Sequence, residues 1–140
     1  RRHTRYIGDW SSDVCSSDLN FIVQALKKQP LTIYGDGSQT RSFCYVDDLI
    51  KGLISLMNSE YIGPVNIGNP DEFTINQLAN LVKEKINLNL EVKNMPLPSD
   101  DPLQRRPDIS LAKNKLSWEP KINIDQGLNL TIDYFKENLI

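Results

Sequence analysis

The stretch Pro30–Leu49 reads PLTIYGDGSQTRSFCYVDDL and carries the clearest local signals in the chain. Its β-branched and aromatic residues at 31–34 predict a short strand, which ends at a glycine-containing turn over 35–38. Alternating side chains predict a second strand at 40–46, and one of the two aspartates that follow is expected to cap a helix over 47–57. The apolar side chains of this helix recur with helical spacing and are expected to face inward: Leu49, Ile50, Leu53, Ile54 and Met57.

Elements of the same kinds continue on both sides of this stretch. Upstream, apolar spacing and a closing pair of lysines predict a helix over 20–28, which Pro30 stops. Downstream we expect a strand, a helix, a strand, a proline-rich loop and two helices, at 64–68, 74–86, 88–95, 96–107, 110–116 and 125–139. Helices that alternate with short strands indicate an α/β fold.

The charge balance and the composition exclude several classes of protein. The chain has 140 residues, with 16 basic and 18 acidic side chains and a net charge of −2, which argues against a nucleic-acid partner. No apolar run approaches the roughly 18 residues that span a bilayer, so no membrane partner is expected. Two cysteines, Cys15 and Cys44, are too few for a disulfide framework or a four-ligand zinc site. The single histidine, His3, lies at the extreme N-terminus, so a histidine-based triad is not expected.

The first nineteen residues, RRHTRYIGDWSSDVCSSDL, differ from the rest of the chain. They lack periodicity and repeat the triplet Ser-Ser-Asp, which would suit a polar linker or a pair of helix caps. The codons implied by residues 9–19, however, resemble a widely used DNA-sequencing adapter. We therefore interpret residues 1–19 as a read-assembly artefact without structure and exclude them from fold reasoning.

Two motifs of nicotinamide-dependent enzymes are absent from the sequence. The turn Gly35-Asp36-Gly37 has no third glycine and does not open a helix, so it is weak as a phosphate-binding loop. None of the five tyrosines is followed by a lysine four residues later. We therefore expect no complete enzyme from these residues alone.

Four motifs, in order, resemble the extended short-chain dehydrogenase/reductase family, and within it the nucleotide-sugar epimerase/dehydratase branch. They are the run Pro30–Leu49, Val65-Asn66-Ile67-Gly68-Asn69-Pro70, Asp101-Pro102-Leu103-Gln104-Arg105-Arg106-Pro107-Asp108 and Leu116-Ser117-Trp118-Glu119-Pro120. Three segments, at 20–22, 39–43 and 106–108, are most similar to the UDP-glucuronate decarboxylase (UDP-xylose synthase) subfamily. The resemblance covers residues 20–140 and implies the C-terminal, nucleotide-sugar-binding part of a Rossmann-type fold, without its N-terminal NAD-binding half.

The resemblance also implies a reaction for the intact enzyme. The C4 hydroxyl of UDP-glucuronate is oxidised with NAD as the oxidant, the β-keto acid loses CO₂, and reduction of the ketone gives UDP-xylose. The glycines that bind NAD and a Tyr-x-x-x-Lys acid/base pair would lie in the N-terminal half. No catalytic or cofactor-binding residue is therefore expected here, and the fragment alone is expected to be inactive. The intact protein is expected to be a cytoplasmic homodimer.

By the same resemblance, seven residues are expected to bind the UDP-sugar: Asn20, Thr32, Tyr34, Arg41, Asn66, Arg105 and Asp108. The ring of Tyr34 would pack on the uracil, whose edge would meet the backbone of 32–34. Arg41 would hold the diphosphate with its fork of donors, and Arg105, with adjacent Arg106 as a possible helper, would meet phosphate or ribose. Asp108 would accept ribose hydroxyls, cap the following helix, or do both.

Further positions leave alternatives open. Asn20 would contact the sugar or the diphosphate, or cap its helix, and Asn66, expected on a buried strand, needs a partner in the ligand or in the backbone. Asp47 and Asp48 are expected to serve as a helix cap and as partners of the helix dipole rather than as a metal pair. An arginine proposed to bind the glucuronate carboxylate in the subfamily would fall at Ser16, inside the suspect segment.

Two other functions are compatible with these motifs. A 4-epimerase or a 4,6-dehydratase would act on another nucleotide sugar, and residues just upstream of Asn20 would distinguish it from a decarboxylase. A non-catalytic UDP-sugar-binding module belongs to a different class and predicts a gene that begins near Asn20.

Overall fold

The computed structural model describes residues 17–97 and 104–139, which form an α/β fold of five helices and five strands. In chain order the elements are α1 (Ser17–Leu26), β1 (Leu31–Tyr34), β2 (Thr40–Ser42), α2 (Val46–Met57), β3 (Glu72–Thr74), α3 (Ile75–Ile86), β4 (Val92–Met95), β5 (Gln104–Arg105), α4 (Ser110–Leu116) and α5 (Ile124–Leu139). Most of these elements match the helices and strands expected from the sequence, within a few residues at their ends.

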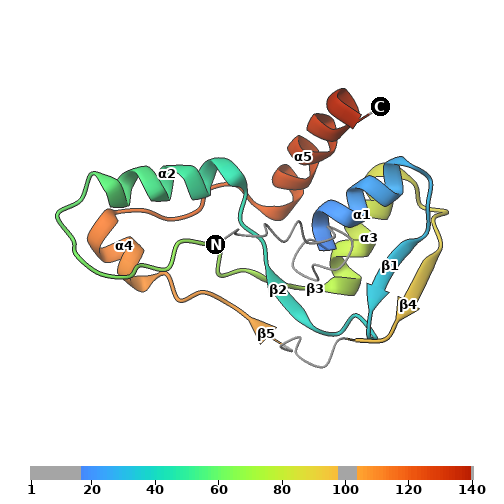
Figure 1. Ribbon diagram of the computed structural model, residues 1–140, viewed down its shortest axis with the longest axis horizontal. Coiled ribbons are helices and arrows are strands. Elements are labelled where there is room, and N and C mark those ends of the chain that lie inside the picture. Colours follow the sequence, from blue (N-terminus) through green and yellow to red (C-terminus); the bar gives the residue numbers. More distant parts are fainter. Residues whose placement is uncertain (1–16, 98–103, 140) are drawn as a thin grey trace, which may run out of the picture.

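The main core lies at one end of the molecule, where α1 and α3 pack beside the parallel pair of strands β1 and β4 (Figure 1). The helix α3 starts as expected, because Thr74 and Gln77 form a reciprocal capping box. The apolar faces of the helices and of β1 bury a contiguous cluster that includes Phe21, Ile22, Leu31, Ile33, Leu78 and Val82. This end of the molecule therefore has a core of its own.

A three-stranded sheet in the order β3-β2-β5 lies beside this core (Figure 1). The central strand β2 pairs antiparallel with β3 and parallel with β5. Because side chains alternate along a strand, Arg41, Phe73 and Arg105 share one face, and Thr40, Ser42, Glu72, Thr74 and Gln104 share the other. We call these the arginine face and the Glu72 face.

The helices α2 and α4 lie at the opposite end and enclose a much smaller buried cluster of Ile109, Ala112 and Trp118 (Figure 1). The Trp118 indole N–H donates to the carbonyl oxygen of Asp48 at 3.0 Å. The buried carboxylate of Asp48 accepts the backbone N–H groups of Lys121 and Ile122, both at 2.7 Å. These bonds fix α2 against the segment that leads from α4 to α5.

Two element boundaries differ from the sequence expectation. The first helix begins at Ser17, inside the segment expected to have no structure. Phe21 and Ile22 are buried in helical conformation, and the helical N–H groups at these positions need carbonyl acceptors four residues earlier, at 17 and 18. Residues 1–16 lie outside the described part of the chain. The strand expected at 40–46 ends at Ser42, where its pairing with β3 ends.

The prediction of a strand at 64–68 is wrong, since these residues have no strand partner in either sheet of the described structure. A strand requires a neighbour that supplies backbone hydrogen bonds, and both sheets are built from other segments. Val65 and Ile67 instead pack against the Trp118 cluster.

The inward face expected for α2 is also wrong. Four of its apolar side chains are about half exposed or more, at 46% for Ile50, 48% for Leu53, 51% for Ile54 and 83% for Met57. The helix buries Asp48 and Gly52 instead. A Cβ atom at Gly52 would lie 2.5 Å from Ile67 Cγ2 and 2.9 Å from Trp118 Cε2, so the missing side chain permits this close packing. No helix in the described segments is both long and apolar enough to cross a membrane.

Ile54→Glu is expected to change the free energy of unfolding of this chain by less than about 0.5 kcal/mol, because the side chain already meets water. Leu78→Glu, which would place a carboxylate in the main core, is the matched control and is expected to unfold the chain. Urea denaturation followed by circular dichroism measures both. A loss of more than about 2 kcal/mol for Ile54→Glu would mean that this face is buried.

Candidate functional site

Two arginines from neighbouring strands form the centre of the candidate site. Arg41 on β2 and Arg105 on β5 are register partners, so both belong to the arginine face. Arg41 is only 8% exposed, and its Nη1 donates to the carbonyl oxygen of Thr40 at 2.7 Å, whereas Arg105 is exposed. Guanidinium groups supply forks of donors that match phosphate oxygens. The register thus places Arg41, expected to hold the diphosphate, beside Arg105, expected to meet phosphate or ribose.

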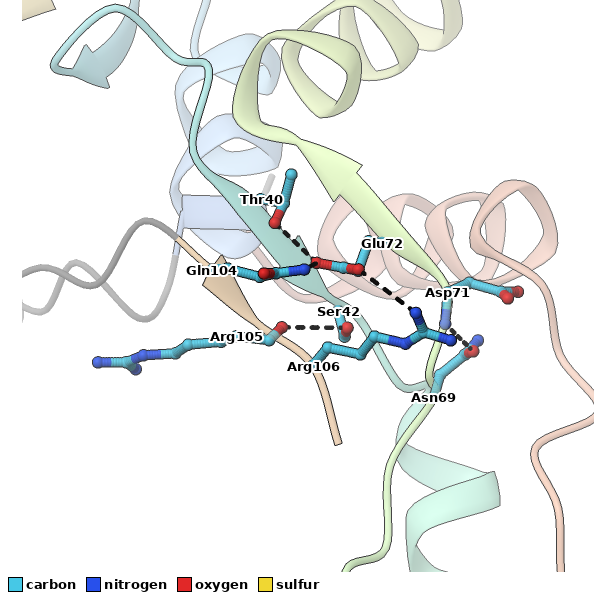
Figure 2. Close-up of polar contacts among 8 residues, drawn as sticks. All are labelled: Thr40, Ser42, Asn69, Asp71, Glu72, Gln104, Arg105 and Arg106. Atoms are coloured by element: carbon cyan, nitrogen blue, oxygen red, sulfur yellow. Dashed lines mark hydrogen bonds and ion pairs between the residues drawn. The ribbon is translucent and has the colours of Figure 1, made fainter. Parts of the chain in front are cut away.

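Glu72 connects all three strands on the opposite face (Figure 2). Its Oε1 accepts the Thr40 hydroxyl at 2.8 Å and the Gln104 amide at 2.7 Å, and its Oε2 lies 3.8 Å from Nη1 of Arg106. These hydrogen bonds, with a smaller contribution from the Arg106 charge, hold the pKa of Glu72 below its usual range.

The side chains of the adjacent residues Arg105 and Arg106 lie apart (Figure 2). Their side chains extend in opposite directions in Figure 2, and the guanidinium of Arg106 approaches Glu72. This arrangement places Arg106 with the Glu72 face, and its role as a helper of Arg105 stays a prediction.

Tyr34 lies at the end of β1, beside the turn that leads to β2. The buried Gln39 amide donates to the Tyr34 carbonyl oxygen at 2.7 Å. Gly35 in the turn has a φ of +74°, which a glycine adopts without strain. The Tyr34 side chain is half-buried, so its ring is partly accessible at this corner.

The backbone N–H of Thr32 is engaged by the protein itself. It donates to Gln24 Oε1 at 3.1 Å, and the Gln24 amide donates to the Thr32 hydroxyl at 3.1 Å. The Thr32 N–H and hydroxyl thus have a partner in α1, and the contact of the 32–34 backbone with a base edge stays a prediction.

Asn66 and Asp108 are brought together, although not on a strand. The Asn66 amide donates to the carbonyl oxygen of Asp108 at 3.1 Å, and both residues are exposed, so the expected buried environment of Asn66 is wrong. The Asp108 carboxylate accepts the Ser110 backbone N–H at 2.9 Å at the start of α4. Hydrogen bonds from the Ser110 side chain and backbone hold the pKa of Asp108 below its usual range. Asp108 thus accepts a hydrogen bond from the first residue of α4, but the N-cap is Ile109, so the expected cap role of Asp108 is wrong. The contact of Asp108 with ribose stays a prediction.

The remaining candidates have mixed outcomes. Asn20 is half-buried in α1, and its ligand role stays a prediction, while Ser16 lies outside the described residues.

Asp47 and Asp48 occupy the first turn of α2, as expected for partners of the helix dipole. The N-cap, however, is Tyr45 without a side-chain cap, so neither aspartate is the cap. Asp48 bonds the 121–122 backbone instead.

Three polar residues that shape the site were missed as candidates in the sequence: Gln24, Gln39 and Glu72. Each acts through contacts with residues 5 to 34 positions away, as in the Gln39–Tyr34 hydrogen bond and the Glu72–Arg106 ion pair. Local spacing contains no signal for such contacts, apart from the general rule that a buried polar side chain needs a partner.

Glu72→Gln is expected to destabilise the chain more at neutral pH than in acid. The pKa of Glu72 lies below the value of about 4.3 for an unfolded glutamate, so its stabilisation is complete above that value and is lost as pH falls through the lowered pKa. Melting temperatures at pH 7 and pH 3 should show a difference between wild type and variant that shrinks in acid. Asp133→Asn, which removes an exposed carboxylate from α5, is the control. A difference that stays constant across this range would contradict the prediction.

Comparison with known proteins extends these observations. A family described as GDP-mannose 4,6 dehydratase matches residues 13–131. UDP-glucuronic acid decarboxylase 2 of Arabidopsis thaliana is 46% identical over 142 residues, which cover 99% of this chain and 32% of that protein. UDP-glucuronic acid decarboxylase 1 of Danio rerio is 52% identical over 120 residues, which cover 86% of this chain and 29% of that protein. The chain thus spans about a third of the length of these curated relatives.

Solved structures show the same fold. The UDP-glucuronic acid 4-epimerase of Bacillus cereus, in complex with UDP-glucuronic acid and NAD, matches with a TM-score of 0.81 and 31% identity over 86% of this chain and 40% of that chain. An epimerase from Methanothermobacter thermautotrophicus matches with a TM-score of 0.84 and 30% identity over 88% of this chain and 38% of that chain. These matches confirm the resemblance drawn from the four motifs, and the family match over residues 13–131 establishes that the chain belongs to the GDP-mannose 4,6 dehydratase family.

Proposed function

We propose that this chain is the UDP-sugar-binding part of an NAD-dependent UDP-glucuronate decarboxylase, which forms UDP-xylose and CO₂. The observation that carries the proposal is the identity of 46% and 52% to UDP-glucuronic acid decarboxylases, over 99% and 86% of this chain. The identity to the two epimerase structures described above is lower, at 30% and 31%.

The residues of this chain would bind and orient the nucleotide end of the substrate. Arg41 and Arg105, paired on neighbouring strands, would neutralise the diphosphate, and the partly accessible ring of Tyr34 would support the uracil. Asn66 and Asp108, already joined by a hydrogen bond, would lie near the ribose or the sugar. Holding the nucleotide in place is a contribution to catalysis by positioning, since the chemistry occurs at C4 and at the carboxylate of the sugar.

The described residues do not fit an NAD site. Dinucleotide pyrophosphates bind at a glycine-rich turn that opens a helix, where backbone N–H groups point at the phosphates. The turn with Gly35 and Gly37 leads into the strand β2 instead, and the side chain of Asn76 occupies the space beside Gly37. NAD would supply hydride transfer at C4 of the sugar, but we assign none of the described residues to it. NAD would bind to residues outside 17–97 and 104–139.

A 4-epimerase of UDP-glucuronate is the second candidate. The UDP-glucuronic acid 4-epimerase of Bacillus cereus, whose crystal structure contains UDP-glucuronic acid and NAD, shares the fold with a TM-score of 0.81. Both enzymes would use the same nucleotide site, so the arginine face does not distinguish them. The homodimer and the cytoplasmic location also stay predictions.

The test is a turnover assay of the full gene product with UDP-glucuronate and NAD. The proposal predicts release of CO₂ and formation of UDP-xylose, which nuclear magnetic resonance identifies directly. UDP-galacturonate without CO₂ would instead establish the epimerase. Binding of UDP-glucuronate without any product would support the non-catalytic module and contradict the decarboxylase.

A further inference from the structure

The strand β5 is only two residues long, yet its register decides which of two adjacent arginines joins Arg41. Within the described residues 104–139, two register pairs connect β5 to β2, namely Thr40 with Gln104 and Arg41 with Arg105. A shift of one residue would exchange the faces of Arg105 and Arg106, because side chains alternate along a strand. So short a backbone ladder supplies little energy against such a shift.

Side chains of the Glu72 face add contacts between β5 and its neighbouring strands. Glu72 accepts the Gln104 amide at 2.7 Å and the Thr40 hydroxyl at 2.8 Å through one oxygen, so this carboxylate joins β5 to β2 (Figure 2). Its other oxygen faces the guanidinium of Arg106 at 3.8 Å. The Glu72 side chain is only 20% exposed, so water competes little for its contacts with Thr40, Gln104 and Arg106.

A second contact reinforces the same register. The Ser42 hydroxyl donates to the Arg105 carbonyl oxygen at 3.1 Å. The two hydrogen bonds that involve β5, from Gln104 to Glu72 and from Ser42 to Arg105, require the observed alignment, since a shift by one residue would replace the Gln104 amide beside Glu72 with the Arg105 side chain.

We propose that Glu72 is a positioning residue that fixes the register of β5, so that Arg105 rather than Arg106 joins Arg41 on the arginine face. Glu72 would do so without touching the ligand, by accepting from Gln104 and by drawing Arg106 to the opposite face. The inference rests on the proposed function, because the arginine face matters to activity only if it binds the UDP diphosphate.

The test is a double-mutant cycle with UDP as the probe and calorimetric titration of the full gene product as the readout. In the wild-type background, Arg105→Gln should weaken UDP binding at least tenfold and Arg106→Gln less than twofold. Glu72→Ala should weaken it about fivefold. In the Glu72→Ala background, Arg106→Gln should now cost at least threefold and Arg105→Gln clearly less than in wild type. Asp133→Asn, the control for loss of a carboxylate, should leave UDP binding unchanged.

The exchanged dependence on the two arginines separates positioning from general destabilisation, which would weaken binding without changing which arginine matters. Equal effects of Arg106→Gln in both backgrounds would overturn the inference. If the wild type fails to bind UDP, the proposed function fails instead. The register is then tested without ligand by amide hydrogen exchange at residues 104–106. Glu72→Ala should accelerate this exchange at least tenfold relative to wild type and Asp133→Asn, and unchanged exchange would overturn the inference.

Discussion

Arg41→Gln and Arg105→Gln are each expected to weaken UDP binding by about 10- to 100-fold, and the double variant by more than either single one. A hydrogen bond to a charged group contributes about 1.5–3 kcal/mol, and about 1.4 kcal/mol corresponds to a factor of ten in affinity. The effect at Arg41 should be at the upper end, because this residue is buried and a phosphate that it binds would be partly shielded from water. Titration calorimetry with UDP measures all three variants.

Two controls make this prediction specific. Lys136→Gln removes an exposed cation from α5 and should not change UDP affinity. Arg41→Lys keeps the charge but loses the planar fork, so its affinity should lie between those of wild type and Arg41→Gln. The diphosphate assignment would be contradicted if both glutamine variants bound UDP as tightly as wild type while retaining the wild-type melting temperature.

Trp118→Ala is expected to lower the free energy of unfolding by about 3–5 kcal/mol. The side chain is 6% exposed, and the cluster around it has only two other buried residues, Ile109 and Ala112, so little else can fill the cavity. The substitution also removes the indole donor to the Asp48 carbonyl oxygen. Urea unfolding followed by circular dichroism gives the value.

Trp118→Phe separates packing from hydrogen bonding. It keeps an aromatic ring but removes the N–H donor, so a loss of about 1 kcal/mol is expected from the missing hydrogen bond. Leu130→Ala, at a side chain that is 47% exposed on α5, is the control for removal of an apolar group and should cost less than about 1 kcal/mol. A loss for Trp118→Ala no greater than that of Leu130→Ala would mean that α2 and α4 are not held by this cluster.

The sequence predicted what depends on neighbours in the chain. Leu31–Tyr34 is a strand as expected, and the Thr74–Gln77 capping box starts α3, because both signals lie within one turn of backbone. The motifs also identified Arg41 and Arg105, which the register then places side by side.

The failures arise where a distant partner decides the outcome. Residues 64–68 have the composition of a strand, but strand formation requires a neighbouring strand. The apolar periodicity of α2 correctly predicts a helix, but not which side is buried, since Gly52 allows Trp118 and Ile67 to pack on the other side. Likewise, the different faces of Arg105 and Arg106 depend on Glu72, more than thirty residues earlier in the sequence.

The most direct test of the account is a crystal structure of the full gene product with UDP bound. We predict that the diphosphate contacts the guanidinium groups of Arg41 and Arg105 on the arginine face, and that the uracil lies against the ring of Tyr34. UDP bound elsewhere, with Arg41 and Arg105 more than about 6 Å from any phosphate oxygen, would contradict the account, since no hydrogen bond reaches that far.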